Sequence, residues 1–243
     1  MKRTKTSHSL IDLSLRPLFQ NEGLRSAYLI STIFIGLVID QHIPVFGQVF
    51  VNVWVCANFI ALVWFADSQE RIESVLCVIL AVLGEMFLSF VWGVYEYREL
   101  NLPIYVPPGH VHVFLVGKYL AKRFQNRMNE VSYGFALFAF TWIIAFKDEF
   151  SMFLAIALVL PVFLAGEKRS LYLWMCLWTF LMENLAVMNG NWAWATWVPI
   201  FELDATKVPV LCGAFYIALD WLIESISRPL GQRQRSGLLA EGQ

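Results

Sequence analysis

The sequence predicts an all-α polytopic membrane protein, a helical bundle of about eight transmembrane helices in two parallel four-helix repeats. Hydrophobic residues make up 58% of the 243-residue chain, aromatic residues 16% and charged residues only 15%. This composition is far more apolar than that of a soluble domain. The net charge is −1, and the sequence contains no basic stripe of the kind that binds nucleic acid, so nucleic acid is not an expected partner.

Eight apolar segments follow a polar lead and predict the eight spans. Several are shorter than the ~20 residues that cross a bilayer, so we expect those helices to extend into the flanking polar residues. The segments are 27–39, 45–66, 72–92, 108–121, 131–146, 150–166, 171–188 and 208–226.

The charged residues between these segments predict the orientation. If the N-terminus is cytoplasmic, most lysines and arginines fall on the inside and the outer loops are acidic or balanced, which is the positive-inside pattern. We therefore expect an integral protein of a bacterial inner (plasma) membrane with both termini cytoplasmic. The inner cations are Lys2, Arg3, Lys5, Arg16, Arg25, Arg71, Lys122, Arg123, Arg127, Lys168, Arg169, Arg228, Arg233 and Arg235.

A motif that occurs twice predicts the repeats. Each copy has an apolar helix with one glutamate, then a glycine and two aromatic residues at alternate positions, then a polar loop to a Val-Pro step and another helix. The first copy holds Glu85, Gly93, Tyr95, Tyr97 and Val106-Pro107; the second holds Glu183, Gly190, Trp192, Trp194 and Val208-Pro209. Four spans per half make the copies parallel, so both motifs should open on the outer face.

The predicted organisation has four parts. Residues 1–26 form a basic, amphipathic cytoplasmic lead, in which Leu10, Leu13, Leu15 and Leu18 could lie on the membrane surface. The first repeat covers 27–129, the second 130–227, and 228–243 form a flexible cytoplasmic tail. The copies differ by one residue, because Glu85 precedes its glycine by eight residues and Glu183 by seven. Both spacings are about two helical turns, so the carboxylates should lie on similar sides.

Glu85 and Glu183 are the strongest catalytic candidates. A carboxylate well inside an apolar helix costs several kcal/mol unless it is paired or protonated, so it should face the bundle interior or a cavity. The alternative is a structural carboxyl, held neutral by hydrogen bonds to Ser89, Asn184 or a neighbouring helix. An acid–base role predicts that Gln at either position abolishes activity, whereas a structural role predicts near-normal function.

His110 and His112 are the other catalytic candidates. They follow Pro107-Pro108-Gly109, a rigid turn that should begin the fourth span, and on a helix they would point to nearly opposite sides. Either could relay a proton to the outer water or only bond the loop. A metal would need further ligands, and no HExxH or HxxxH motif is present; the sequence identifies neither a metal nor a cofactor.

Tyr95, Tyr97, Trp192 and Trp194 fall at the expected outer interface. Such residues commonly anchor a protein at the membrane surface, but their alternate spacing would also let them line one wall of a mouth that is accessible to lipid. Together with Asn184 they form the predicted substrate-binding set.

The membrane glutamate followed by Gly-x-Tyr-x-Tyr resembles the integral membrane proteins of carotenoid biosynthesis, of the carotenoid hydratase and lycopene cyclase type. Glu85, Gly93, Tyr95 and Tyr97 carry the resemblance, with Glu183, Gly190, Trp192 and Trp194 as a second set. The family's Pro-Phe step before the glycine is Val91-Trp92 here. What the resemblance implies is an acid-initiated reaction on an isoprenoid double bond.

These observations predict an enzyme of the hydratase, cyclase or isomerase type that performs acid–base chemistry on an apolar isoprenoid or lipid within the bilayer. One glutamate would act as the acid and the other would stabilise a cation or accept the proton. The alternative is a non-enzymatic membrane protein: a carrier that binds a proton or cation, or a subunit that assembles a complex. The expected partners are the bilayer and a hydrophobic small molecule.

Overall fold

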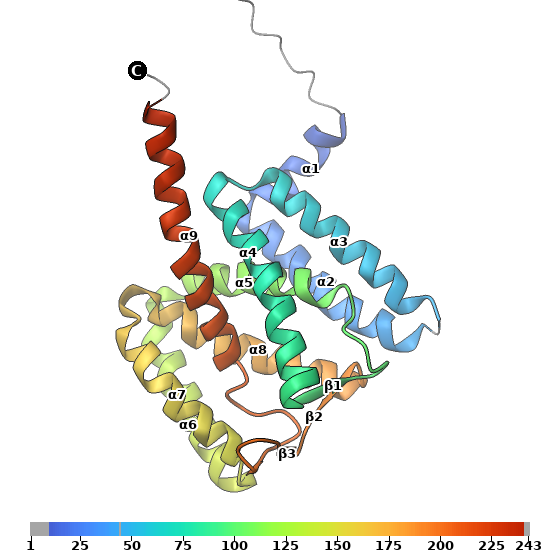
Figure 1. Ribbon diagram of the computed structural model, residues 1–243, viewed down its shortest axis with the longest axis vertical. Coiled ribbons are helices and arrows are strands. Elements are labelled where there is room, and N and C mark those ends of the chain that lie inside the picture. The colour runs from blue at the N-terminus through green and yellow to red at the C-terminus, as the bar shows by residue number, and fades with distance from the viewer. Residues whose placement is uncertain (1–9, 44, 241–243) are drawn as a thin grey trace, which may run out of the picture.

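The structure is a computed structural model that describes residues 10–43 and 45–240. It is mainly helical, as predicted (Figure 1). The cations expected at positions 2, 3 and 5, and the last three residues of the tail, lie outside the described residues. The α-helices are α1 Leu10–Gln20, α2 Glu22–His42, α3 Gly47–Phe65, α4 Ser68–Glu85, α5 Val106–Arg123, α6 Met128–Phe146, α7 Glu149–Leu164, α8 Arg169–Asn189 and α9 Ala214–Ala240.

Five of the described helices are long and apolar enough to cross a membrane. They are α2, α3, α4 with the π-helix η1 (Met86–Trp92), α6 with the 3-10 helix η2 (Gln125–Arg127), and α8. α7 is also apolar but has 16 residues. Segment 27–39 lies within the 21 residues of α2, so this helix does extend into its polar flanks. Large apolar side chains such as Val53 and Trp64 are exposed, which is compatible with a lipid environment.

Two helix pairs at the centre of the bundle join the two halves of the sequence. α4 packs along α9, and α5 packs along α8. Each glutamate helix therefore contacts the helix that follows the Val-Pro step of the other motif. In Figure 1, α1 and the end of α9 lie at one end of the molecule and the strands lie toward the other. The expected tail, 228–243, continues α9 as helix to Ala240.

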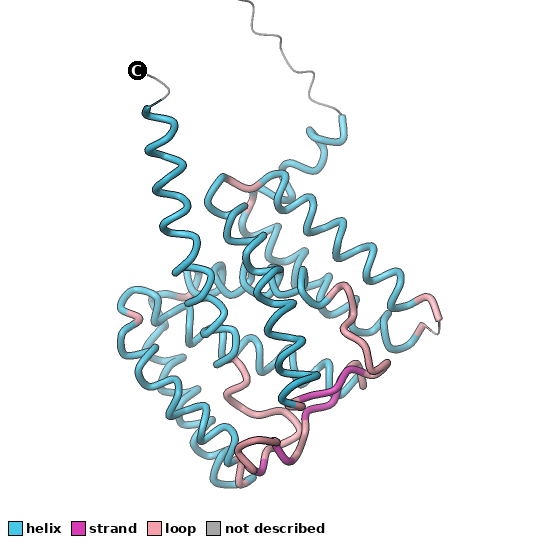
Figure 2. Tube along the Cα trace, in the orientation of Figure 1, coloured by secondary structure: helices cyan, strands magenta, loops and turns pink. Residues whose placement is uncertain are grey.

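The two aromatic motifs pair with one another in an antiparallel ribbon. Strand β1 (Tyr95–Tyr97) pairs with β2 (Trp192–Trp194) so that Tyr95 faces Trp194 and Tyr97 faces Trp192. A second short pair, β3 (Trp197–Val198) with β4 (Leu203–Asp204), follows in the loop before α9. Figure 2 shows the strands at the ends of the glutamate helices.

The two ends of the ribbon are closed by equivalent backbone bonds. Arg98 donates its N–H to the carbonyl of Asn191 at 3.1 Å, and Ala195 donates to the carbonyl of Val94 at 2.8 Å. Val94 and Asn191 each directly follow a motif glycine. In each bond, the residue after one strand donates to the residue that follows the glycine of the other copy. A two-fold axis through the ribbon would relate these two bonds.

The extra residue of the first copy is taken up by a π-helix. The last turns of this helix, η1, are wound so that Gly93 donates its N–H to Leu88, five residues back, whereas Gly190 donates to Ala186, four residues back. Both glycines then adopt nearly the same left-handed conformation, with φ of 75° and 79°. A π-turn accommodates one inserted residue without moving the ends of the helix, so both helices reach the ribbon in the same way.

One buried aspartate anchors the loop that leads into α5, and a second anchors the loop that leads into α9. Asp40, at the end of α2, accepts hydrogen bonds from the Tyr105 hydroxyl at 3.2 Å and the Asn191 amide at 2.7 Å. Asp148, at the start of α7, accepts from the Thr206 hydroxyl at 3.0 Å and the Val210 N–H at 3.3 Å. Both aspartates are at most 2% exposed, and paired donors are what make a buried carboxylate tolerable.

Candidate functional site

Glu85 lies at the end of α4 and is 7% exposed. Its Oε2 accepts hydrogen bonds from the hydroxyls of Tyr95 and Tyr97, which come from β1 of the same copy. Burial, together with the nearby Glu85, raises the pKa of both phenols well above the usual value for tyrosine. Both tyrosines therefore remain protonated and act as donors to this oxygen.

The other oxygen of Glu85 faces His110. Nε2 of the imidazole lies 3.2 Å from Glu85 Oε1, and Nδ1 lies 3.0 Å from the carbonyl oxygen of Val106. A carbonyl oxygen can only accept, so Nδ1 carries a hydrogen, and one further proton must lie between Nε2 and Oε1. The pair is then either a neutral acid with a neutral base or a carboxylate with an imidazolium. In both forms it holds one transferable proton.

Glu183 lies in α8 and is also 7% exposed. Its Oε2 accepts from the indole N–H groups of Trp192 at 2.7 Å and Trp194 at 3.0 Å. The pattern matches that of Glu85, with both donors taken from the strand of the same copy. An indole N–H only donates, so these bonds favour a carboxylate with a fixed position. Among the described residues, no hydrogen bond reaches the other oxygen of Glu183.

The four aromatic residues of the ribbon pack against one another across the two copies. The ring centroids of Tyr95 and Trp194 are 5.1 Å apart and those of Tyr97 and Trp192 are 5.8 Å apart. In each strand the residue between them, Glu96 or Ala193, is exposed. The ribbon therefore holds one aromatic face next to the two carboxylates, as the alternate spacing predicts.

Both glutamates, His110 and the four ribbon aromatics line one cavity of about 270 Å³. The rest of its wall is mostly apolar and comes mainly from α4, η1 and α9. Two of the wall residues, Phe87 and Leu222, are 48% and 50% exposed on the outside of the bundle. A cavity with apolar walls and a few convergent polar groups is the usual form of a small-molecule site.

Two residues of this cavity, Cys212 and Tyr216, are not among the candidates predicted from the sequence. Tyr216 stacks on His110, with 5.0 Å between ring centroids and 15° between planes. Cys212 follows Val208 by four residues, as His110 follows Val106, so it holds the place of His110 in the second copy. Aligning the copies on their Val-Pro steps would have found Cys212. Tyr216 lies four residues after Cys212, in the first turn of α9, and only the packing of both α5 and α9 against α4 and α8 brings it to the histidine.

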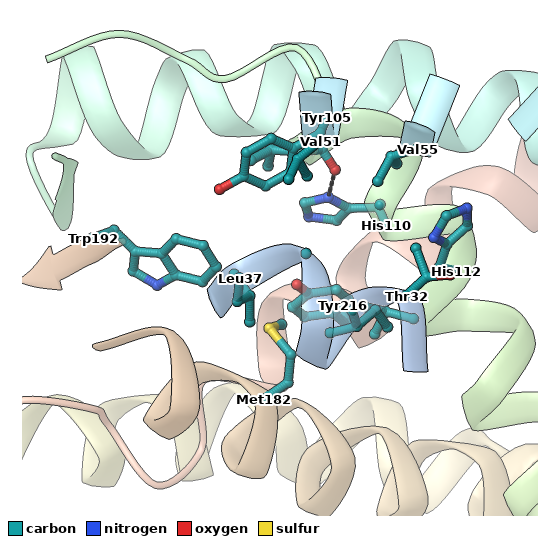
Figure 3. A pocket seen from close by; sticks show the side chains of 15 residues that line it. Thr32, Leu37, Val51, Val55, Tyr105, His110, His112, Met182, Trp192 and Tyr216 are labelled. Carbon is teal, nitrogen blue, oxygen red and sulfur yellow. Dashed lines mark hydrogen bonds between the residues drawn. The ribbon is translucent and has the colours of Figure 1, made fainter. Parts of the chain in front are cut away.

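His112 and Asn184 lie outside the wall of this cavity. α5 points the rings of His110 and His112 to different sides, as expected for two helical residues at this spacing (Figure 3). His112 lines a second, smaller pocket. Asn184 donates its side-chain amide to the carbonyl of Phe180 at 2.7 Å, within its own helix. In the described part of the chain, no group of three or more His, Cys, Asp or Glu residues could hold a metal.

Comparisons with protein-family models, curated proteins and solved structures found no match for this chain. The geometry of its own residues is therefore what bears on its function.

Proposed function

We propose that the protein is a membrane enzyme that starts acid–base chemistry on a double bond of an apolar, isoprenoid-like substrate held in the glutamate cavity. One observation carries this proposal: Nε2 of His110 lies 3.2 Å from Oε1 of Glu85, close enough to share a proton, in a cavity with mostly apolar walls that also contains the carboxyl of Glu183. A shared proton that can move between two groups is what a general acid requires.

The surroundings of the two carboxyls suggest a division of roles. Glu85, relayed by His110, donates the proton to one carbon of the double bond, and a cation forms on the other carbon. Glu183 and the faces of the ribbon aromatics then stabilise the cation through charge and cation–π attraction. The reaction ends when a proton leaves the neighbouring carbon or when a nucleophile adds. In both cases the proton that is released, from the neighbouring carbon or from the nucleophile, passes to a carboxylate or to His110.

The substrate class rests on the cavity wall and on the resemblance of the motif to carotenoid-biosynthesis proteins. The wall is mostly apolar, and Phe87 and Leu222 belong both to it and to the outer surface of the bundle. This supports entry of a substrate from the bilayer past Phe87 of η1 and Leu222 of α9, without crossing water. This favours a long hydrocarbon with double bonds over a polar metabolite.

The proposal includes a membrane arrangement of eight spans, α2 to α9, in two parallel repeats with both ends cytoplasmic. It is supported by the repeated ribbon bonds, the matched glycine conformations and the two anchoring aspartates. Cysteines introduced at Glu99 and Asp204 test it in intact cells. Both should react with an impermeant reagent from the outside, and protection of either would overturn this topology.

The activity is tested by expressing the protein in cells that make a linear polyisoprenoid hydrocarbon such as lycopene and comparing lipid extracts with and without it. A new product is expected with the native chain and is lost in Glu85→Gln and in Glu183→Gln. Gln keeps the shape of the side chain and removes only the titratable group. Equal insertion of the variants, measured by blotting membrane fractions, is the control.

Full activity in both Gln variants, with instability appearing only on replacement by Leu, would show that the glutamates are structural. Unchanged lipid extracts together with proton-dependent transport into vesicles would instead favour a carrier.

A further inference from the structure

A second pocket, of about 60 Å³, adjoins the glutamate cavity on the side of α2 and α3. Among the described residues, these two helices contribute nothing to the glutamate cavity. Conversely, Phe87 and Leu222, where that cavity reaches the outside of the bundle, do not line the pocket. Figure 3 shows Val51 and Val55 of α3 on one side of the pocket and Met182 of α8 on the opposite side. The pocket therefore extends away from the membrane-facing wall of the glutamate cavity.

The space in this pocket is bounded mostly by apolar groups. Among its polar neighbours, the hydroxyl of Tyr105 is bound to Asp40. The indole N–H of Trp192 is bound to Glu183. His112 is 0% exposed, so its ring nitrogens do not reach the space. An apolar cavity of this kind stays free of water and takes up apolar guests such as benzene or xenon.

The pocket begins where the proposed proton donor ends. Four residues line both spaces: Val106, His110, Trp192 and Tyr216. One of them, His110, is the imidazole beside Glu85. A single layer of side chains therefore lies between the pocket and a double bond held at the carboxyl of Glu85.

Two glycines keep this space open. Gly109, in the first turn of α5, and Gly36 of α2 both line the pocket. A Cβ at Gly109 would meet nothing within 4 Å, and one at Gly36 would meet only a methyl group of Val51, at 3.4 Å. A cavity of about 150 Å³ holds one benzene, with six carbons, so a volume of about 60 Å³ holds about two or three carbons.

We propose that this pocket is a subsite that binds the alkyl end of the substrate, a group of about two or three carbons next to the double bond that Glu85 protonates. This inference rests on the proposed function. The remainder of the hydrocarbon lies in the glutamate cavity and leaves it past Phe87 and Leu222. No bond forms or breaks in the subsite. It selects substrates by the bulk of their end, because a small branched end fits and a longer alkyl group or a ring does not.

Xenon tests for the subsite without requiring activity, because it is a small apolar guest. The native protein, in lipid nanodiscs and with ¹³C-labelled methionine methyls, is exposed to rising xenon pressure. Met182 lines the pocket, whereas Met175 is equally buried and lines neither space. The NMR signal of Met182 should shift several-fold more than that of Met175 and level off as the pocket fills. Equal shifts would overturn the proposal.

Two further conditions show whether the xenon lies in this pocket and whether the substrate uses it. Gly109→Leu places a side chain in the space and should abolish the xenon response of Met182. Val55→Phe fills it from α3 if Gly109→Leu fails to insert. Gly134→Leu, on the exposed face of α6 with equal free space, is the control and should change nothing.

Saturating lycopene should also abolish the response of Met182 in the native protein, since the end of the chain takes the place of xenon. An unchanged response in a filled variant that inserts, or in the presence of lycopene, would overturn the proposal.

Selectivity is tested with lycopene and a synthetic analogue in which ethyl groups replace the terminal methyl groups. The native protein in nanodiscs should convert lycopene about tenfold or more faster than the analogue, the usual effect of one methylene in an apolar pocket. Val113 lines only this pocket, one turn after Gly109, so Val113→Ala should enlarge it and reduce that preference several-fold. The same preference in both proteins would overturn the role in selectivity. If neither hydrocarbon reacts, the proposed function fails, and the displacement of xenon by lycopene still decides the subsite.

Discussion

The two glutamates occupy equivalent places in the two motifs but have different neighbours. Each accepts two hydrogen bonds from the aromatic residues that follow it in its own copy. Glu85 has phenols and an imidazole, groups that can carry and exchange protons, whereas Glu183 has indoles, which only donate. The imidazole of the first copy is replaced in the second by the thiol of Cys212. The shared backbone frame thus holds one carboxyl beside groups that exchange protons and one carboxyl whose hydrogen-bond donors do not.

The largest expected difference between the two sites is at His110 and Cys212. His110→Gln should lower activity about 10²- to 10⁴-fold, the range for a general acid–base group, because Glu85 then loses its proton partner. Cys212→Ser should remain close to the native rate. Product formation per amount of inserted protein measures both. A large loss in Cys212→Ser would mean that both copies take part in proton transfer.

One-residue deletions test the π-helix. Deleting Val91, which is exposed in η1, gives the first copy the spacing of the second, so the turn should become α-helical and the ribbon should survive with a stability change within about 1 kcal/mol. Deleting the exposed Met188 in α8 leaves no spare residue and rotates Glu183 by about 100°. That variant should fail to insert into the membrane or should unfold at a much lower temperature. Equal tolerance of both deletions, measured by thermal unfolding in detergent, would contradict the comparison.

The hydroxyls of Tyr95 and Tyr97 can be removed with little change in packing. Tyr→Phe at either position should lower stability by about 1–3 kcal/mol, because the buried carboxyl of Glu85 loses a donor while the ring contacts with Trp192 and Trp194 remain. The same substitution combined with Glu85→Gln should cost less than the sum of the two single changes. Strict additivity would show that the phenols do not act through Glu85.

The lysine pairs of the two halves, at Lys118 and Lys168, should show the smallest effect. Lys168, in the 3-10 helix η3 (Gly166–Lys168), pairs with Asp220 at 2.8 Å and Glu224 at 2.7 Å. Lys118 pairs with one carboxylate among the described residues, Glu73, at 2.8 Å. Lys168→Met should cost at most about 1 kcal/mol and Lys118→Met less, as is usual for partly exposed pairs. Thermal unfolding of the two variants measures this order, and the reverse order would contradict it.

The pH dependence of the native protein provides a check on Lys168. Burial opposes its charge, but the bonds and attraction of Asp220 and Glu224 outweigh that effect and raise the pKa of Lys168 above its ordinary value. A group whose pKa is raised by folding stabilises the folded state at every pH below its unfolded pKa. This contribution should therefore be constant between about pH 6 and 9 and be lost only as the pH rises through the raised pKa. A difference between native and Lys168→Met melting temperatures that changes within this range would contradict the assignment.

The sequence alone determined the helical class, the apolar segments and the repeated motif. Hydropathy and motif spacing are local properties of the chain, and they survive whichever way the helices pack. The start of α5 at its Pro-Pro step and the grouping of alternate aromatic residues on one face also follow from local rules. The roles of the candidate residues stay predictions.

Only the tertiary structure decided which residues meet. The chain contains no local signal that Tyr95 pairs with Trp194, residues that lie in different halves of the sequence, or that Tyr216 stacks on His110. The sequence also contains no local signal that distinguishes His110 from His112. A step of two residues turns a helix by about 200°, so the ring of His110 reaches Glu85 and the ring of His112 points away from it. Which side faced the glutamate depended on how α5 packs between α4 and α8, and that packing is set by contacts between distant segments rather than by the sequence near either histidine.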